Sequence, residues 1–322
     1  MNEEALFASI DLGGTKIACA LGTARGEIVV DDAIPTLSHE GPEAVLSRTA
    51  DLVNKLAERA GRAPASAGMG VPGLADVDAG YTRFLPNLPT QWRDVPVRDI
   101  LSPRIGCPVF LLNDVRTAAL GELVHGLGRT ANTMAFYALG TGIGGGIVID
   151  GKLRLGPLGA AGELGHQTIL PDGPLCGCGN YGCLETLAGG PAITAQGVWL
   201  MLSGRAPRLY ELTDGDPARV TPREMAAAAT AGDADVSDAI RRAAGYLAIG
   251  IANVIVTLHP DLVVLGGGVA QIGDRLFDTI RETVRRRVRM FPVDDVRILP
   301  SALGARAGVL GGIALAARQG VV

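Results

Sequence analysis

The sequence predicts an α/β protein with two lobes and a central cleft, built from two copies of one unit. Two observations support this prediction: an order of strands and glycine turns at residues 5–34 recurs at 133–155, and helical patterns follow both copies. A duplication of this kind is expected to place its two glycine turns opposite each other across the cleft. With 322 residues, the chain is long enough for two domains with separate cores.

The first copy contains three β-rich segments joined by turns. The strands are expected at 6–12, 16–21 and 27–34, with turns at Gly13-Gly14 and near Arg25-Gly26. The following segment, 42–60, has apolar residues at 45, 46, 52, 53 and 56, a spacing that predicts an amphipathic helix.

The second copy repeats this order with a longer glycine run. A strand at 133–139 is followed by Gly140–Gly146, a strand at 147–149, a turn at Asp150-Gly151 and a strand at 152–155. Gly140, Gly142 and Gly145 fit the dinucleotide-binding spacing formally. A β-like run follows them where that fingerprint needs a helix, so we reject that interpretation.

Composition and charge narrow the function classes. Hydrophobic residues make up 48% of the chain and aromatic residues 4%, so the cores are expected to consist of aliphatic side chains. A net charge of −4 gives no reason to expect nucleic acid as a partner. The arginines between 281 and 289 form a basic run, but Ile280, Val284 and Val288 repeat beneath it at helical spacing, which indicates a solvated helix face.

We also expect a cytoplasmic protein without membrane association. No signal peptide precedes the first strand, and the longest apolar stretch, 247–258, is too short for a bilayer and contains Asn253. The five cysteines are an odd number and do not suggest a disulfide framework.

Three of these cysteines and one histidine predict a metal site. Cys176, Cys178 and Cys183 fall within eight residues, and His166 precedes them by ten. Three thiolates and one imidazole are the donors of a closed tetrahedral zinc site, which has no position for a reacting water. The zinc is therefore expected to be structural, with the chemistry nearby. The alternative is a loop of reduced thiols.

The two glycine turns are candidates for binding phosphate. Glycine turns expose backbone N–H groups to phosphate oxygens, and Thr15, Lys16 and Thr141 add side-chain donors. The Walker spacing is absent, and hairpin turns without a ligand are the alternative. Gly266-Gly267-Gly268 follows the strand expected at 262–265, a position suited to a bound nucleotide.

Asn113-Asp114 lies between a strand expected at 109–112 and a helix expected at 117–125. A helix cap explains one of these polar residues. Phosphoryl transfer to a hydroxyl group needs a carboxylate to receive the proton and Mg²⁺ to neutralise charge, and Asp114 has the chemistry for the first role. Glu163, His166 and Glu185 could accept hydrogen bonds from sugar hydroxyls, with zinc fixing the His166 ring. Both acidic residues are expected to be oriented by the zinc loop, with the glycine turns distant from it.

Together these segments resemble the ROK family (repressors, open reading frames and sugar kinases) of the actin-like ATPase superfamily. The resemblance covers nearly the whole chain. The matching segments are Asp11–Lys16, Gly70–Gly73, Asn87–Pro89 with Trp92, Asn113-Asp114, Leu120–Glu122, Gly140–Gly146, Gly162–His166, Cys176–Glu185 and Gly266–Gly268. One departure is Val115-Arg116-Thr117, where family members often carry small residues and Asn.

The resemblance implies a duplicated ribonuclease-H-like fold. Its N-terminal lobe would be residues 1–117 plus 306–322, with the last helix returning to it, and its C-terminal lobe would be 118–305. Asp114 would be the catalytic base, and the sugar site would include Gly70, Asn87, Asn113, Asp114, Glu163, His166 and Glu185. ATP would contact Asp11, Gly13, Gly14, Thr15, Lys16, Gly140, Thr141, Gly142, Gly266, Gly267 and Gly268. Zinc would use His166, Cys176, Cys178 and Cys183.

The resulting expectation is an ATP- and Mg²⁺-dependent hexokinase, a glucokinase first, acting on a 6-hydroxyl group. A kinase for N-acetylmannosamine, N-acetylglucosamine, mannose, allose or fructose is the alternative within this chemistry. A sugar-sensing repressor is disfavoured, because Asp11 follows only ten residues and a helix-turn-helix domain needs several dozen. A silent sugar-binding protein would require that ATP fails to bind. A homodimer, or else a homotetramer, is the family expectation.

Overall fold

Contacts divide the chain into two compact units. The computed structural model describes residues 5–322. The first unit comprises Met1–Ala131, Gly146–Ala161 and Ala302–Val322, and the second comprises Asn132–Gly145 and Gly162–Ser301. These bounds differ from the lobes expected from the sequence, because residues 118–131, 146–161 and 302–305 group with the first unit.

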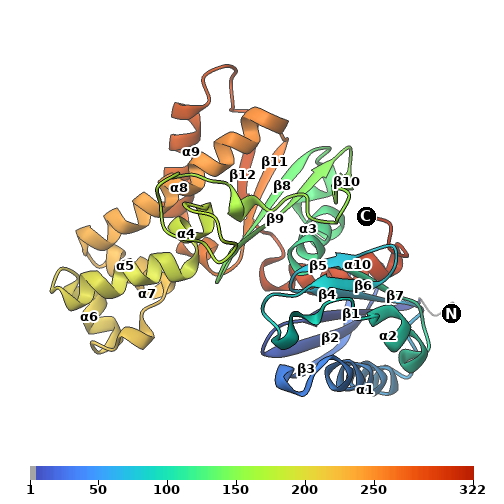
Figure 1. The fold of residues 1–322 in the computed structure, drawn as a ribbon. Coiled ribbons are helices and arrows are strands. Elements are labelled where there is room, and N and C mark those ends of the chain that lie inside the picture. Colours follow the sequence, from blue (N-terminus) through green and yellow to red (C-terminus); the bar gives the residue numbers. More distant parts are fainter. Residues whose placement is uncertain (1–4) are drawn as a thin grey trace. The chain divides into compact units, whose positions relative to one another are not determined.

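The first unit is built on a five-stranded sheet in the order β3-β2-β1-β4-β7 (Figure 1). The strands are β1 (Leu6–Leu12), β2 (Lys16–Thr23), β3 (Ile28–Pro35), β4 (Ala67–Val71) and β7 (Val109–Asn113). β1, β4 and β7 are parallel, whereas β1–β2 and β2–β3 are antiparallel. A separate hairpin pairs β5 (Leu74–Asp76) with β6 (Tyr81–Phe84).

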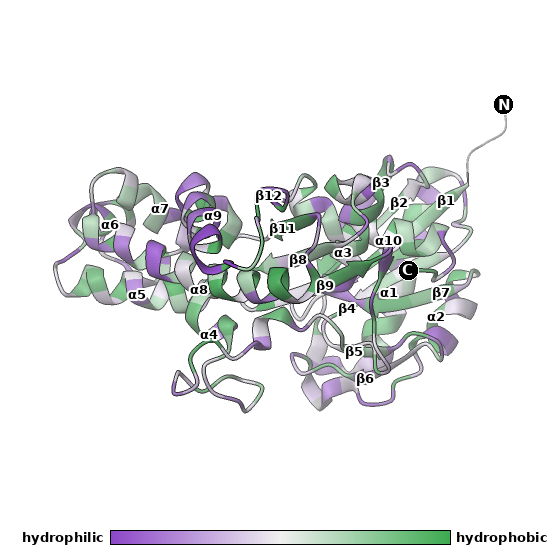
Figure 2. Ribbon diagram, turned by 90° about the horizontal axis from the view of Figure 1, so that it is seen from above, coloured by the Kyte–Doolittle hydropathy of each residue, from purple (hydrophilic) through white to green (hydrophobic). Residues whose placement is uncertain are grey.

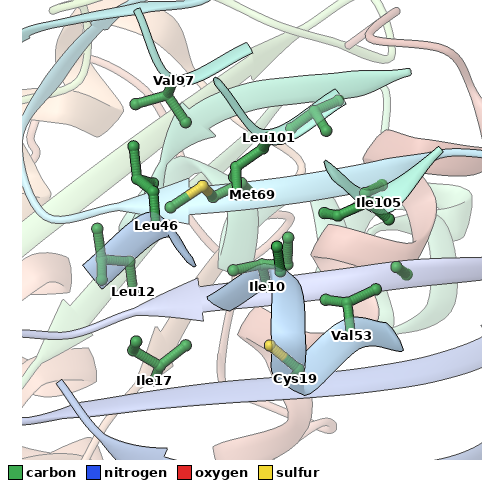
Figure 3. Packing of buried hydrophobic residues seen from close by; sticks show 14 of the residues in the cluster. Ile10, Leu12, Ile17, Cys19, Leu46, Val53, Met69, Val97, Leu101 and Ile105 are labelled. Atoms are coloured by element: carbon green, nitrogen blue, oxygen red, sulfur yellow. The ribbon is translucent and has the colours of Figure 1, made fainter. Parts of the chain in front are cut away.

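Helices α1 (Pro42–Ala60) and α2 (Val97–Ile105) supply the core of this unit on one side of the sheet. Figure 3 shows Ile10, Met69 and Cys19 from the strands packed with Leu46, Val53 and Leu101 from these helices. The five apolar positions that predicted α1 are all buried. The side chains are mostly aliphatic, as the composition predicts.

Helix α10 (Ala307–Ala317), near the end of the chain, packs against β1, β4 and α3 (Asp114–His125) in the first unit (Figure 1). Glycines bring the two helices close together: a Cβ on Gly311 would lie 1.7 Å from the Thr117 carbonyl oxygen, and one on Gly121 would lie 2.2 Å from that of Ala307. The return of the last helix to the N-terminal part of the chain agrees with the sequence expectation.

The second sheet has the order β10-β9-β8-β11-β12. Its strands are β8 (Met134–Leu139), β9 (Ile143–Ile149), β10 (Lys152–Leu153), β11 (Leu262–Gly266) and β12 (Arg297–Pro300). β8, β11 and β12 are parallel. This order repeats that of the first sheet strand for strand, as a duplication predicts.

The remaining helices belong to the second unit. They are α4 (Leu184–Ala188), α5 (Gly190–Leu202), α6 (Pro207–Thr213), α7 (Pro222–Thr230), α8 (Ala234–Leu258) and α9 (Asp274–Arg287). Figure 2 shows α9 largely in the hydrophilic colour. Ile280, Val284 and Val288 are buried beneath its arginines, so the solvated-face interpretation holds.

Helix α8 is long and apolar enough to cross a membrane by length and composition, and among the described residues it alone meets that test. Most of its apolar window is buried inside the protein, with Leu247, Ile251 and Ile255 fully covered. We therefore describe α8 as a core helix, in agreement with the sequence expectation for 247–258.

The second glycine run differs from its prediction. The turn is confined to Gly140–Gly142, and β9 begins at Ile143 rather than at 147. Gly145 and Gly146 lie inside β9, where neighbouring segments approach the backbone so closely that a side chain would not fit. A Cβ on Gly145 would lie 2.5 Å from the Gly162 carbonyl oxygen, and one on Gly146 would lie 2.6 Å from the Ala119 Cβ.

Candidate active site

The candidate residues of the first unit gather at one edge of its sheet. The carboxyl ends of parallel strands meet at the same edge, which is where open α/β sheets bind ligands. Asp11 on β1 is paired with Gly70 on β4, and Val71 on β4 with Asn113 on β7. The turn at Gly13-Gly14 therefore lies on the same edge as Asn113-Asp114.

The first glycine turn is held closed by its backbone. The Gly13 N–H donates to the Lys16 carbonyl oxygen at 2.9 Å, and the Thr36 hydroxyl donates to the Gly13 carbonyl oxygen at 2.7 Å. Thr15 and Lys16 are exposed, so their donors are accessible to a ligand. Asp11 lies just before the turn. Burial raises the pKa of its carboxyl group, and the positive charge of Lys16 opposes that rise.

Asn113 and Asp114 have separate roles in the structure. Asn113 is the N-cap of α3, because its Oδ1 accepts hydrogen bonds from the N–H groups of Val115 and Arg116 at 3.0 and 3.1 Å. Asp114 is the first helical residue, and its Oδ1 accepts from the Val115 N–H at 2.8 Å. The cap therefore explains Asn113, and Asp114 presents its carboxylate at the N-terminus of α3.

The backbones of Gly70 and Asn87 lie close to the candidate residues at this edge of the sheet. A Cβ on Gly70 would lie 3.3 Å from the Asp114 Cα, so glycine allows β4 to approach the start of α3 closely. Asn87 is exposed, and its carbonyl oxygen would lie 3.6 Å from a Cβ placed on Gly14.

Arg116, the departure from the family pattern, points away from the aqueous surface. Its side chain is 1% exposed, and its Nε and Nη2 donate to the Ala161 carbonyl oxygen at 3.0 and 2.9 Å. Both residues belong to the first unit, and Ala161 is the last residue before the chain returns to the second unit at Gly162. Arg116 thus anchors the segment that leads into Gly162-Glu163.

The candidate residues of the second unit also gather at the carboxyl ends of parallel strands. Gly266 on β11 is paired with Ala138 on β8, so the turn at Gly140–Gly142 and Gly266–Gly268 lie on one edge. Gly267 has φ +86°, and a Cβ there would lie 2.3 Å from the Leu139 carbonyl oxygen. The Gly140 N–H donates to the Gly142 carbonyl oxygen at 2.9 Å and closes the turn.

His166, Cys176, Cys178 and Cys183 form a cluster, as predicted. Their four ligand atoms lie within 4.8 Å of one another. The Sγ atoms of Cys178 and Cys183 are 3.7 Å apart, and Cys176 Sγ lies 3.6 Å from His166 Nδ1. Sulfurs bound to one zinc at about 2.3 Å would be about 3.8 Å apart in a tetrahedron, so the cluster fits zinc in both donor type and spacing.

The three thiols differ in their surroundings. Cys176 and Cys183 are buried and Cys178 is exposed. Burial raises the pKa of Cys176, and it raises the pKa of Cys183 to about 12. The Asn180 N–H lowers the pKa of Cys178. Together with buried Cys19 and Cys107, all five cysteines are free thiols, so no disulfide framework is present.

Glu185 lies against the second glycine turn, although the sequence suggested that the zinc loop and the turns are distant. Its Oε2 accepts from the Ile143 N–H at 2.9 Å, and its Oε1 lies 3.8 Å from Cys176 Sγ. A Cβ on Gly142 would lie 2.2 Å from Oε2. Glu163, by contrast, is exposed, and His166 is half-buried.

Two contributors were missed by the sequence argument. Thr36 supports the first turn from the end of β3, and no spacing signal precedes it. Gly190 starts α5, and its N–H donates to the Gly140 carbonyl oxygen at 2.8 Å. The dipeptide Gly189-Gly190 before Pro191 could have drawn attention to that contact, since it combines a close-approach residue with a helix start.

The comparisons with known proteins match this chain to the family that its sequence resembles. The model of the ROK family matches residues 7–319. A glucokinase of Halalkalibacterium halodurans is 35% identical over 311 residues, which is 95% of this chain and 93% of that protein. A glucokinase of Streptomyces coelicolor is 34% identical, with 97% of each chain covered.

A solved structure agrees with these relatives. The ROK family glucokinase from Streptomyces griseus, in complex with glucose and AMPPNP, has a TM-score of 0.84 and 32% identity, and the match covers 98% of this chain and 100% of that one. This likeness confirms the predicted actin-like ATPase fold. A xylose repressor of Caldicellulosiruptor bescii is 32% identical, but the match covers 76% of its length.

Proposed function

This chain belongs to the ROK family, and from that premise we propose that it is a glucokinase, transferring the γ-phosphoryl group of ATP to the 6-hydroxyl group of D-glucose. It is an ATP-dependent sugar kinase of the glucokinase type. The observation that carries this conclusion is the match to glucokinases at 34–35% identity over 93% or more of both chains.

In the first unit, we assign proton acceptance to Asp114. Its Oδ1 accepts a hydrogen bond from the Val115 N–H at 2.8 Å, which orients the carboxylate at the N-terminus of α3. Asn113 uses one amide N–H on the Gly73 carbonyl oxygen at 3.1 Å and keeps a second for the sugar. Positioning of this kind is the main protein contribution to phosphoryl transfer, since the transition state is loose.

The two glycine turns are assigned to the phosphates of ATP. Thr15 and Lys16 are exposed beside the first turn, and Thr141 is exposed in the second. Backbone N–H groups in such turns bind phosphate oxygens, and Gly266–Gly268 is assigned to the adenosine. Mg²⁺ would neutralise charge on the phosphates, and Asp11 offers the carboxylate oxygen that this hard cation prefers.

We assign a structural zinc to His166, Cys176, Cys178 and Cys183. Four protein ligands close the coordination shell, so the metal would hold the loop rather than react. Because Nδ1 is the His166 atom close to Cys176, Nε2 is left for the sugar. Glu163 and Glu185 complete the assigned sugar contacts from this unit, together with Gly70 and Asn87 from the first.

A kinase for N-acetylmannosamine, N-acetylglucosamine, mannose, allose or fructose is the second candidate. These sugars require the same phosphoryl chemistry and differ in pocket shape. The repressor alternative is less well supported, because the xylose repressors are matched over 74–77% of their length, against 93–97% for the glucokinases. We further propose a cytoplasmic location and a homodimer or homotetramer.

The test is a coupled ADP-release assay with Mg²⁺-ATP across about ten hexoses and their 2-acetamido derivatives. Glucose should have the highest kcat/KM. A higher value for another sugar would reassign the substrate while keeping the kinase. Absence of ADP release with every sugar, in a preparation that binds an ATP analogue, would refute the kinase function.

A further inference from the structure

Residues 164–185, the zinc loop that carries the metal cluster, approach the start of β9, just after the second glycine turn, at three points. Glu185 Oε2 accepts from the Ile143 N–H at 2.9 Å. A Cβ on Gly165 would lie 1.8 Å from the Ile143 carbonyl oxygen, and one on Gly145 would lie 2.5 Å from the Leu164 Cγ. The residue after the turn, Ile143, is therefore contacted at both its N–H and its carbonyl oxygen. All of these residues belong to the second unit.

Each contact lies next to a member of the metal cluster. Gly165 directly precedes His166, and Glu185 is two residues after Cys183. Glu185 Oε1 also lies 3.8 Å from Cys176 Sγ. The two segments that contact Ile143 would thus be joined through one ion, because His166 is on the first and Cys183 is on the second.

The hydrogen bond between the Glu185 carboxylate and the Ile143 N–H is not needed for a sugar contact. Gly142 leaves room for its carboxylate, since any Cβ at that position would lie 2.2 Å from Oε2. A charge-assisted hydrogen bond from a backbone N–H is stronger than a neutral one. The carboxylate therefore fixes the backbone at the start of β9, immediately after the N–H groups assigned to phosphate.

We propose that Glu185 is a positioning residue for the nucleotide, and that the metal cluster sets the affinity for ATP by holding Glu185 and Gly165 against Ile143. This inference rests on the proposed function only in assigning Gly140–Gly142 to the phosphates of ATP. It replaces the expectation that the glycine turns are distant from the zinc loop. A turn that already has its ligand-bound conformation loses less conformational entropy when the ligand binds, so the ligand binds more tightly.

The test compares Glu185→Ala with Glu185→Gln. The amide oxygen of glutamine can still accept from the Ile143 N–H, whereas alanine leaves it without that acceptor. Glu211→Ala, a change of the same type at an exposed site on α6, is the matched control. Binding of Mg²⁺-AMPPNP is measured by titration calorimetry without sugar, with zinc content determined on the same preparations.

We expect AMPPNP affinity to fall about tenfold in Glu185→Ala, with zinc retained, and to stay within about threefold of wild type in Glu185→Gln. Hydrogen–deuterium exchange of peptides covering 139–146 should be faster in Glu185→Ala than in wild type, Glu185→Gln or Glu211→Ala. Wild-type AMPPNP affinity in Glu185→Ala would overturn the proposal and leave Glu185 as a sugar contact. A wild-type protein that binds no AMPPNP would instead refute the proposed function.

The metal is tested separately through Cys178→Ser, because Cys178 is the exposed ligand. Leu175→Ala, in the same loop at a 63% exposed side chain, is its control. We expect Cys178→Ser to lose zinc, to bind AMPPNP more weakly and to exchange faster over 139–146. Chelation of the folded wild-type protein should give the same three changes. Loss of zinc with unchanged AMPPNP affinity and unchanged exchange would contradict the role of the cluster.

Discussion

Replacement of Arg116 by lysine separates hydrogen bonding from charge at a buried position. The arginine is 1% exposed and donates to the Ala161 carbonyl oxygen from both Nε and Nη2. Lysine keeps a positive charge at the site, so the desolvation cost remains. It lacks the planar pair of donors, because its ammonium group is a single point on a flexible chain.

The expected loss follows from the removal of one charge-assisted hydrogen bond. Such bonds contribute about 1.5–3 kcal/mol to the free energy of unfolding. In a protein unit of about 150–250 residues, 1 kcal/mol changes Tm by about 2–4 °C. Arg116→Lys should therefore lower the Tm of the first unit by about 3–12 °C.

Tryptophan fluorescence can report this unit alone. Trp92 is buried in the first unit, whereas Trp199 is 56% exposed on α5 in the second. In a Trp199→Phe background, thermal unfolding is followed through Trp92. Arg59→Lys is the control, because Arg59 forms an exposed pair with Asp32 at 3.6 Å and such pairs contribute about 0–1 kcal/mol. Equal Tm values for the two lysine variants would refute the reasoning.

Asp114→Asn should reduce kcat about 10²–10⁴-fold with little change in Tm or glucose affinity, because the amide oxygen can keep the hydrogen bond to α3; near-normal turnover would refute its role as base. Gly311→Ala should destabilise the protein by about 1–3 kcal/mol in urea unfolding, since its Cβ would lie 1.7 Å from the Thr117 carbonyl oxygen, whereas Gly245→Ala, with nothing within 4 Å, should not destabilise it. Two backbone N–H groups lower the pKa of Asp261 from 3.8, so its contribution to stability is present above about pH 4 and is lost as pH falls through the lowered value. Urea unfolding of Asp261→Asn should accordingly show a weaker decline between about pH 4 and pH 2; a decline as steep as that of wild type would contradict this.

Local patterns predicted the first sheet well. The strand at 6–12, expected from a β-rich segment before a glycine turn, and the helix at 42–60, expected from helical spacing, have the predicted bounds. Their signals are local, because the residues that carry them lie within the segment itself. The Cys–His cluster was also predictable, since its three cysteines lie within one short loop.

The second glycine run was harder to predict because its glycines serve two purposes. Gly140 and Gly142 form a turn, whereas Gly145 and Gly146 admit neighbours from residues 162 and 119. Only the tertiary structure distinguishes these uses. The same holds for Arg116, whose partner Ala161 is 45 residues away, and for Glu185, whose contact with Ile143 spans 42 residues.

The position of α10 has a consequence for synthesis of the protein. The helix covers β1, β4 and α3, yet it is translated about 180 residues after α3 ends. At 5–20 residues per second, the ribosome needs about 10–40 s to supply it. During that interval the apolar surface that α10 later buries is exposed on the nascent chain, so the first unit can complete its folding only as translation of the second unit ends.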